Sequence, residues 1–271
     1  MSDRVLCTIS SGVADVRINR PDKRNALDPA TFRELIAVGE GLKAERGLRA
    51  VVLSGNGASF CSGLDFASFE AMLSGPSTDE LGGIGSMVPG RATHVGQQTV
   101  HVWREIEVPV IAAIQGHALG GGLQIAMGAD LRIVHPDAQL SVLEIRWGLV
   151  PDMTLTQFLP QLVGLDVAKE LTFTGRVVSG REAVEIGLAT KVSETPLDDA
   201  LAMAQEIAGK NPFAIRGAKK LLDMAGAAPV ADGFAEERRL MFSLVGSPNQ
   251  IEAVQAFFAK RPPQFADVPL D

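Results

Sequence analysis

A buried strand that runs directly into a glycine-rich turn occurs twice in this sequence, and this unit constrains the fold more than any other feature. Residues 50–54 and 108–114 are almost entirely apolar, and each run is followed by closely spaced glycines. The second turn leads into an apolar helical segment at 123–127, and residues 131–134 repeat the strand pattern. Strands that alternate with turns and helices in this way predict an α/β fold with right-handed crossovers.

The segments on either side of these units also carry clear signals. Residues 4–19 alternate apolar and polar side chains around a Ser-Ser-Gly turn, which predicts a hairpin. Asp28 followed by Pro29 predicts the start of a helix, since Asp is a favoured N-cap and Pro a favoured first helical residue. Residues 74–96 are rich in glycine and predict a mobile surface segment or lid. In the second half, helical patterns cover 155–163, 167–171, 180–187, 197–209, 214–224 and 231–258.

Composition and charge exclude several classes of protein. Apolar residues make up 46% of the chain and charged residues 21%, as in a globular rather than a disordered protein. The net charge is −7 and no basic run is present, so we expect no nucleic-acid partner. The sequence has no signal-peptide pattern and no apolar stretch of about 18 residues, so we expect neither export nor membrane insertion. Cys7 and Cys61 fit neither a disulfide framework nor a metal motif, which predicts a reducing compartment, with the cytoplasm as the default.

Motifs for cofactors and metals are missing from the sequence. Ile125 stands where a dinucleotide-binding GxGxxG motif that starts at Gly120 needs its third glycine. Walker, HExxH and GxSxG motifs are absent, and the four histidines lie far apart along the chain. We therefore expect no metal and no separate cofactor. The chain also lacks tyrosine, so we expect its proton chemistry to rely on carboxylates.

Three stretches of the chain carry a family likeness. Residues 20–27 (RPDKRNAL), 55–65 (GNGASFCSGLD) and 116–124 (GHALGGGLQ) closely resemble the signature stretches of the enoyl-CoA hydratase/isomerase (crotonase) family. The likeness continues through residues 144–152 to Gly187 and covers nearly the whole chain in order. It implies the α/β crotonase (ClpP/crotonase-like) spiral of ββα units. Residues 1–200 would form the core with the CoA-thioester site, and residues 201–271 a helical trimerisation region.

The same resemblance implies the substrate and the assembly. An acyl-CoA thioester would bind as the substrate, with coenzyme A a part of that substrate rather than a cofactor. The reaction would belong to fatty acid metabolism. The family also implies a homotrimer or a dimer of trimers.

The glycine turns suit this chemistry on physical grounds. A strand that ends in a glycine turn and begins a helix leaves backbone N–H groups unpaired, and glycine lets the backbone come close to a ligand. Two such turns that face one point would bind the oxygen of a thioester as it becomes an enolate. The resemblance places these donors, the oxyanion hole, at the N–H groups of Leu64 and Gly121. Alternatively, the glycines at 120–122 only permit close packing of strand and helix.

Three polar residues decide which reaction such a site would catalyse. In hydratases of the family, two glutamates hold and activate water; Gln124 stands at the first of these positions and Glu144 at the second. An amide cannot exchange a proton near neutral pH, which speaks against hydration by two glutamates. Asp152 lies eight residues after Glu144, and this spacing resembles the acid pair of the dienoyl-CoA isomerases, which pass a proton across a conjugated system. Those isomerases carry a third acid at the Gln124 position.

The loop between the two acids supports their pairing. Gly148 and Pro151 prevent a continuous helix, so the loop can bring both carboxylates to one pocket. Apolar neighbours and mutual repulsion should raise the pKa of at least one of the two acids. Two structural alternatives remain open: Asp152 as the N-cap of the following helix, and Glu144 in an ion pair with Arg146.

The signals for binding the CoA group are less specific. The candidate residues are Arg24, Ala26, Ser62 and Asp65 at family positions, and Lys260 and Arg261 near the end of the chain, which could reach CoA from the last helix. The basic residues could equally be solvated surface charges.

The sequence therefore predicts double-bond isomerisation of an enoyl- or dienoyl-CoA, with Glu144 as the base and Asp152 as the partner acid. Hydration of a 2-enoyl-CoA is the first alternative. Aryl-CoA dehalogenation is another, because a nucleophilic aspartate occurs near the Asp152 position in that branch of the family. A non-catalytic acyl-CoA binder is a different class of function, and the paired acids speak against it, since a binder has no use for them.

Overall fold

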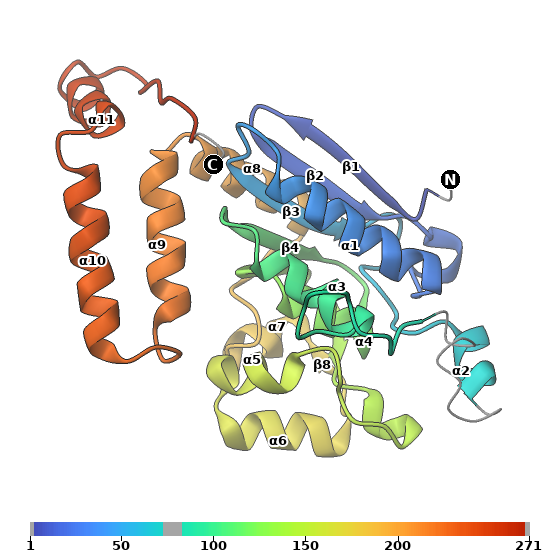
Figure 1. Cartoon of the computed structure of the whole chain (residues 1–271). Coiled ribbons are helices and arrows are strands. Elements are labelled where there is room, and N and C mark those ends of the chain that lie inside the picture. Colours follow the sequence, from blue (N-terminus) through green and yellow to red (C-terminus); the bar gives the residue numbers. More distant parts are fainter. Residues whose placement is uncertain (1–2, 73–82, 269–271) are drawn as a thin grey trace.

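A six-stranded sheet, in the order β1-β2-β3-β4-β6-β9, forms the frame of the protein (Figure 1). The computed structural model describes residues 3–72 and 83–268. β1 and β2 pair antiparallel as the predicted hairpin, and each later neighbour in the sheet is parallel. The strands are β1 (Val5–Ser10), β2 (Val13–Ile18), β3 (Ala50–Gly55), β4 (Val110–Ile114), β6 (Leu131–Val134) and β9 (Lys191–Val192). The predicted α/β architecture is confirmed.

Helices cover both faces of this sheet, which is why β3 and β4 are buried along their whole length. Val51 and Leu53 face one helical layer, while Val52, pointing the other way, packs in a separate cluster with Ala200 and Ala204. Asp28 caps the first helix as predicted, with its Oδ1 accepting from the N–H of Thr31 at 2.8 Å. The helices involved are α1 (Pro29–Lys43), α3 (Val95–Arg104) and α4 (Gly121–Met127) on one face and α8 (Pro196–Ala208) on the other.

A second, three-stranded sheet, in the order β5-β7-β8, lies beside the glycine turns. Its strands are β5 (His117–Leu119), β7 (Gln139–Ser141) and β8 (Val178–Ser179). The sequence patterns did not predict them, because strands of two or three residues are too short to show a period of two. They matter for the site, since β5 leads directly into α4 and β7 leads into η2 (Glu144–Trp147).

The remaining helices follow the predicted patterns with one correction. They are α2 (Phe66–Met72), α5 (Leu155–Val163), α6 (Leu165–Thr174), α7 (Gly180–Glu185), α9 (Pro212–Met224), α10 (Val230–Leu244) and α11 (Pro248–Phe258). The single helical stretch predicted over 231–258 is two helices. The Ser247 side chain accepts from the N–H of Gln250, and Pro248 occupies the first turn, so a new helix begins there.

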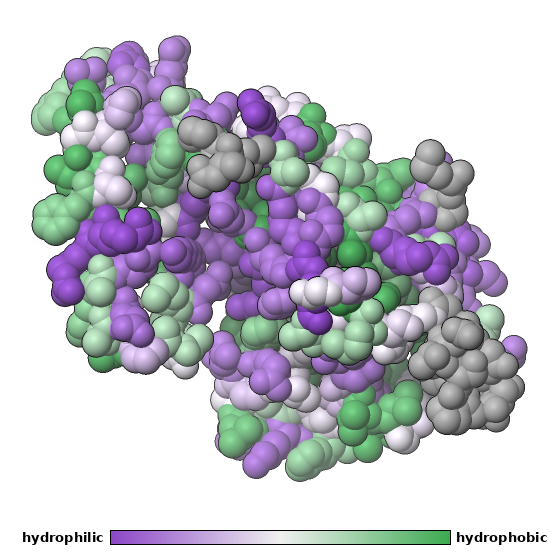
Figure 2. Space-filling view, in the orientation of Figure 1, coloured by the Kyte–Doolittle hydropathy of each residue, from purple (hydrophilic) through white to green (hydrophobic). Residues whose placement is uncertain are grey.

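The C-terminal helices α9, α10 and α11 lie to one side of the sheet (Figure 1). α9 is fastened to the core by Lys219, whose Nζ lies 2.8 Å from Oδ2 of Asp130 and 3.1 Å from the carbonyl oxygen of Val108. Apolar surface is spread over these helices (Figure 2), and the exposed side chains include Phe234, Met241, Phe242, Phe257 and Phe258. The boundary predicted at residue 200 falls within α8, and the trimerisation role of the segment after it stays a prediction.

Part of the glycine-rich segment at 74–96 lies outside the described residues, which end at 72 and resume at 83. The lid predicted for 74–96 thus lies partly outside the described residues and stays a prediction. In the remainder, Arg91 binds Glu40 at 2.7 Å and Glu105 at 2.6 Å, which ties residues 83–94 to α1 and α3. No helix within the two described ranges is long and apolar enough to cross a membrane, and these ranges contain no group of three metal-ligating side chains.

Candidate active site

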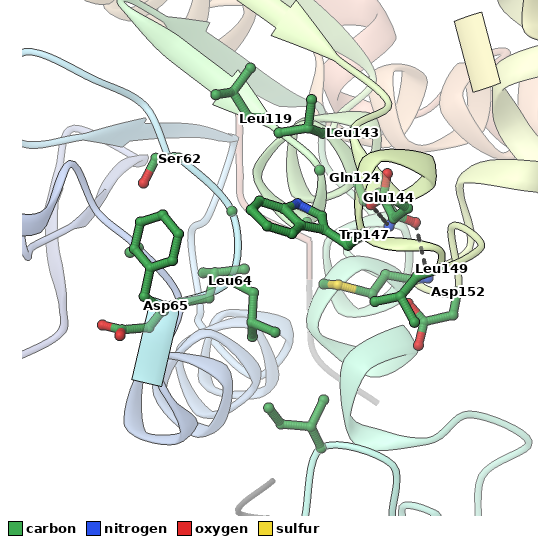
Figure 3. Close-up of a pocket in the computed structure, with 18 of the residues that line it drawn as sticks. Ser62, Leu64, Asp65, Leu119, Gln124, Leu143, Glu144, Trp147, Leu149 and Asp152 are labelled. Carbon is green, nitrogen blue, oxygen red and sulfur yellow. Dashed lines mark hydrogen bonds between the residues drawn. The ribbon is translucent and has the colours of Figure 1, made fainter. Parts of the chain in front are cut away.

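A cavity of about 820 Å³ brings together four segments that are far apart in the sequence (Figure 3). Its walls come from residues 22–27, 62–66, 119–121 and 143–153, together with Gln124 and a few further side chains. Most of the predicted site residues line it: Arg24, Ala26, Ser62, Leu64, Asp65, Gly121, Gln124, Glu144 and Asp152.

The two glycine turns meet at the inner end of this cavity. The N–H of Cys61 donates to the carbonyl oxygen of His117 at 2.8 Å, and the N–H of Leu119 donates to that of Cys61 at 3.1 Å. Gly63 has a φ of +92°, and a Cβ atom there would lie 2.7 Å from the carbonyl oxygen of Leu119 and 3.9 Å from the nitrogen of Gly121. Glycine at this position therefore permits the two turns to pack backbone against backbone.

This packing leaves two N–H groups ready to receive a ligand. The N–H of Leu27 donates to the carbonyl oxygen of Gly63, and the N–H of Asp65 donates to the carbonyl oxygen of Leu27. The N–H of Leu64, which lies between these two hydrogen bonds, has no backbone acceptor within the described residues. Gly121 is the first residue of α4, where an N–H has no acceptor in its own helix. The donors predicted for an oxyanion hole thus lie on adjacent turns that line one cavity.

The buried amide of Asn25 fixes the first of these segments. Its Oδ1 accepts from the N–H of Arg20 at 2.7 Å, and its Nδ2 donates to the carbonyl oxygens of Ser59 at 2.7 Å and Asn56 at 3.0 Å. Because Asn25 is 0% exposed, these hydrogen bonds are shielded from water. They hold residues 20–27 against the turn that carries Leu64.

Glu144 lies beside the second glycine turn, at the start of η2. Glu144 is only 8% exposed. Its Oε1 lies close to the backbone of the turn, since a Cβ atom added to Gly120 would be 3.4 Å from it. Oε1 accepts from Nε2 of Gln124 at 2.6 Å, whereas Oε2 is buried and has no hydrogen-bond partner among the described residues. Burial is the main cause that raises the pKa of Glu144 above its ordinary value, and the negative charge of Asp152 raises it further. The backbone N–H groups of Glu144 and Leu143 and the side chain of Gln124 lower the pKa and offset this only in part.

Gln124 joins this carboxylate to the start of α5. Its Oε1 accepts from the N–H of Met153 at 2.9 Å and from that of Leu155 at 3.4 Å. Figure 3 shows the amide of Gln124 between Glu144 and the backbone that follows Asp152. Sequence analysis placed Gln124 at the site but gave no sign of these partners, because they lie 29 and 31 residues further along the chain.

Asp152 lines the same cavity but is exposed. It does not cap α5, because Thr154 occupies the N-cap position and makes no side-chain cap hydrogen bond. The other structural alternative is not seen either: among the ion pairs of the described residues, none joins Glu144 to Arg146, and Glu144 hydrogen-bonds Gln124 instead. Both acids thus remain available to a ligand in the cavity.

The candidates for CoA binding fall into two groups. Arg24, Ala26 and Ser62 line the cavity, and so does Asp65, whose carboxylate forms an ion pair with Arg20. Lys260 and Arg261 follow α11 and do not line the cavity of their own chain. Arg261 is held by Glu252 at 2.6 Å. A contact of these two residues with CoA stays a prediction, and it would require a neighbouring copy of the chain.

The apolar wall contains residues that the motifs did not reveal. Phe66 and Trp147 pack edge to face with their ring centroids 6.4 Å apart, and both line the cavity. Leu119, Leu143 and Met153 line it as well. For Phe66, the one signal in the sequence was its place directly after the Gly-Leu-Asp turn at 63–65.

Comparison with known proteins agrees with this geometry. The sequence profile of the Enoyl-CoA hydratase/isomerase family matches residues 8–268. The chain is 34% identical over 269 residues to the human protein named "Enoyl-CoA hydratase domain-containing protein 2, mitochondrial", covering 97% of this chain and 88% of that protein. It is also 34% identical over 259 residues to an Arabidopsis thaliana protein named "Delta(3,5)-Delta(2,4)-dienoyl-CoA isomerase, peroxisomal", covering 94% of this chain and 93% of that one.

A solved structure supports the same relationship. The crystal structure of a putative enoyl-CoA hydratase/isomerase from Mycobacterium abscessus superposes with a TM-score of 0.88 at 31% sequence identity, over 97% of this chain and 99% of the other. The names of the two relatives above place them in mitochondria and peroxisomes. They therefore give no support to the predicted cytoplasmic location, which stays a prediction.

Proposed function

Because the chain belongs to the enoyl-CoA hydratase/isomerase (crotonase) family, we propose that it moves a double bond within an enoyl- or dienoyl-CoA thioester. The observation that carries this proposal is the pairing at the buried end of the cavity. One carboxyl group, Glu144, lies beside an amide, Gln124, both of whose acceptor positions are taken by backbone N–H groups. Such a pair can take a proton from carbon, but it lacks a second buried acid to activate water.

The reaction follows from the positions of the donors and the acids. The thioester oxygen accepts hydrogen bonds from the N–H groups of Leu64 and Gly121, which stabilise the negative charge that develops there. Glu144 takes the proton from the carbon next to the thioester carbonyl. The electron pair of that C–H bond spreads over the thioester oxygen and the conjugated chain.

The second half of the reaction returns a proton at the far carbon of the conjugated system. Asp152, at the exposed wall of the cavity, relays this proton from solvent to the carbon; the double bond shifts, and the thioester carbonyl re-forms. Glu144 has then gained one proton, and it releases that proton once the product leaves.

A panel of 2-enoyl-, 3-enoyl- and 3,5-dienoyl-CoA substrates tests this function. We expect isomerisation of at least one class of unsaturated substrate. The absorbance of the newly conjugated thioester measures its rate. The variant Glu144→Gln should lose about 10²–10⁴-fold in rate, as general acid–base residues do. Rapid hydration of 2-enoyl-CoA without any isomerisation would replace this function by the hydratase alternative. Stoichiometric binding without turnover of any substrate would favour the non-catalytic binder.

We also propose that the chain assembles as a homotrimer or a dimer of trimers through its C-terminal helices. The support is apolar side chains on α10 and α11, among them Phe242 and Phe257, each 78% exposed. Single chains rarely leave such a surface in water. Light scattering on the purified protein should give three or six times the mass of the chain, and a monomer at micromolar concentration would contradict the proposal.

A further inference from the structure

We propose that Gln124 is a positioning residue that reserves one oxygen of Glu144, Oε2, for the proton that the reaction moves. This inference rests on the proposed function, in which Glu144 is the base. It goes beyond that function by assigning the two oxygens of one carboxyl group to different tasks.

The orientation of the Gln124 amide follows from its partners. The backbone N–H groups of Met153 and Leu155 can only donate, so the atom that accepts from both, at 2.9 Å and 3.4 Å, must be the amide oxygen. The amide nitrogen is then the atom that faces Glu144. It lies 2.6 Å from Oε1, and at this position it can only donate.

This donor decides where Glu144 can carry a proton. An O–H on Oε1 would either point its hydrogen at the hydrogen of the Gln124 amide or offer that amide a hydroxyl oxygen, which is a weaker acceptor than a carbonyl oxygen. The proton is therefore favoured on Oε2, which is buried and has no hydrogen-bond partner among the described residues. Glu144 lines the cavity, and Oε2 is its one oxygen without a partner among the described residues, so we assign the substrate's proton to this oxygen.

The same contact sets how basic Glu144 is. The Gln124 N–H favours the carboxylate, whereas burial and the charge of Asp152 favour the protonated form. The charged side chains that share the cavity walls near Glu144 are Arg146, on the same helical turn, and Asp152, on the loop before α5; α4 contributes the uncharged Gln124. Losing the Gln124 donor should thus raise the pH at which Glu144 becomes an effective base.

The test uses a substitution that removes the amide donor to Glu144 but keeps the anchor, which is an oxygen that accepts from the N–H groups of Met153 and Leu155. In Gln124→Glu, one carboxylate oxygen can still accept from Met153 and Leu155, but the other meets Oε1 of Glu144, so the two carboxyls must share a proton. A control, Gln157→Glu, introduces the same charge change on the exposed surface of α5, outside the cavity. A third variant, Asp152→Asn, shows how much of any shift comes from the charge of Asp152.

The readout is the exchange of the substrate's C2 hydrogens for deuterium from heavy water, measured by mass spectrometry as a function of pH. We expect the acidic limb of the exchange rate to move upward by about 1–2 pH units in Gln124→Glu. KM should change little, and the limb in Gln157→Glu should match the parent. Gln124→Leu, which removes donor and anchor together, should shift the limb in the same direction and also lower the melting temperature.

Two results would overturn the inference. One is an acidic limb in Gln124→Glu that coincides with the parent; Gln124 would then only hold the loop. The other is an equal shift in Gln157→Glu, which would make the effect one of overall charge. Failure of the proposed function looks different: the parent would exchange C2 hydrogens but produce no isomer, and the comparison of pH profiles would still decide the role of Gln124.

Discussion

The substitution Gly63→Ala would test whether close packing of the two glycine turns creates the oxyanion hole. An added Cβ atom would lie 2.7 Å from the carbonyl oxygen of Leu119, well inside the 3.4 Å at which ordinary contact begins. Both neighbours are backbone, so one turn must move by more than half an ångström. A displacement of up to about 1 Å in a catalytic site costs on the order of 10²-fold in rate, and loss of one oxyanion donor costs about 10²–10³-fold in kcat.

The matched control is Gly226→Ala. Gly226 has a φ of +77°, close to the +92° of Gly63, but a Cβ atom there would meet no atom of the described residues within 4 Å. Both variants lose about 1–2 kcal/mol of unfolding free energy from the left-handed backbone, and Gly63→Ala loses about 1–3 kcal/mol more from the clash. Urea unfolding measures these losses, and steady-state isomerisation measures kcat and KM.

The kinetic pattern separates the two variants. We expect Gly226→Ala to keep the parent kcat, and Gly63→Ala to lose at least about 10²-fold in kcat with little change in KM, since the oxyanion donors act in the transition state. If Gly63→Ala kept kcat within threefold of the parent while folded, the argument from backbone packing would be refuted.

Three further predictions concern other parts of the molecule. Burial raises the pKa of Glu144 in the folded protein, so folding favours its protonated form. The stability of the parent, measured by urea unfolding, should therefore fall relative to Glu144→Gln as the pH rises above the ordinary Glu pKa of 4.5, and a constant difference would contradict the burial argument. Lys219→Ala should destabilise the protein by about 3–5 kcal/mol, because Asp130 loses its ion-pair partner and keeps the N–H of Val110, while kcat should stay unchanged. A loss below about 1 kcal/mol would show that α9 does not depend on this pair. Arg261→Ala should leave the melting temperature within about 1–2 °C of the parent, since its pair with Glu252 is on the surface. A raised KM in this variant would show that a neighbouring copy brings Arg261 to bound CoA, and an unchanged KM would contradict that contact.

The larger elements could be predicted because each carries a strong local signal. β3 and β4 are continuous apolar runs, and the Asp-Pro pair at 28–29 defines the start of α1. The second sheet could not be predicted, since β5, β7 and β8 span two or three residues and depend on partners elsewhere in the chain. Ser247 before Pro248 indicates the break between α10 and α11, but the helical pattern on both sides favoured one continuous helix.

The candidate site likewise has a part with a local sequence signal and a part that depends on distant residues. Its backbone part, the two glycine turns, is local and was visible in the sequence. Its side-chain part depends on where the loop after η2 returns. That loop places the N–H of Met153 against Gln124, and it brings Asp152 to the wall of the same cavity as Glu144 but leaves it exposed. Neither outcome follows from spacing, because a loop without a repeating pattern has many possible paths.

The unpaired oxygen of Glu144 links the stability of the protein to its chemistry. A buried polar atom without a partner destabilises a fold by about 1–3 kcal/mol, and Oε2 is such an atom. The lack of solvation that destabilises the carboxylate also makes it a stronger base toward carbon, since little solvent must be removed before a proton is transferred. Glu144→Gln can keep its contact with Gln124 through the amide oxygen while it removes the buried charge. If Glu144 serves the reaction, Glu144→Gln should gain stability at neutral pH and lose turnover. If Glu144 had a purely structural role, the variant would lose stability instead.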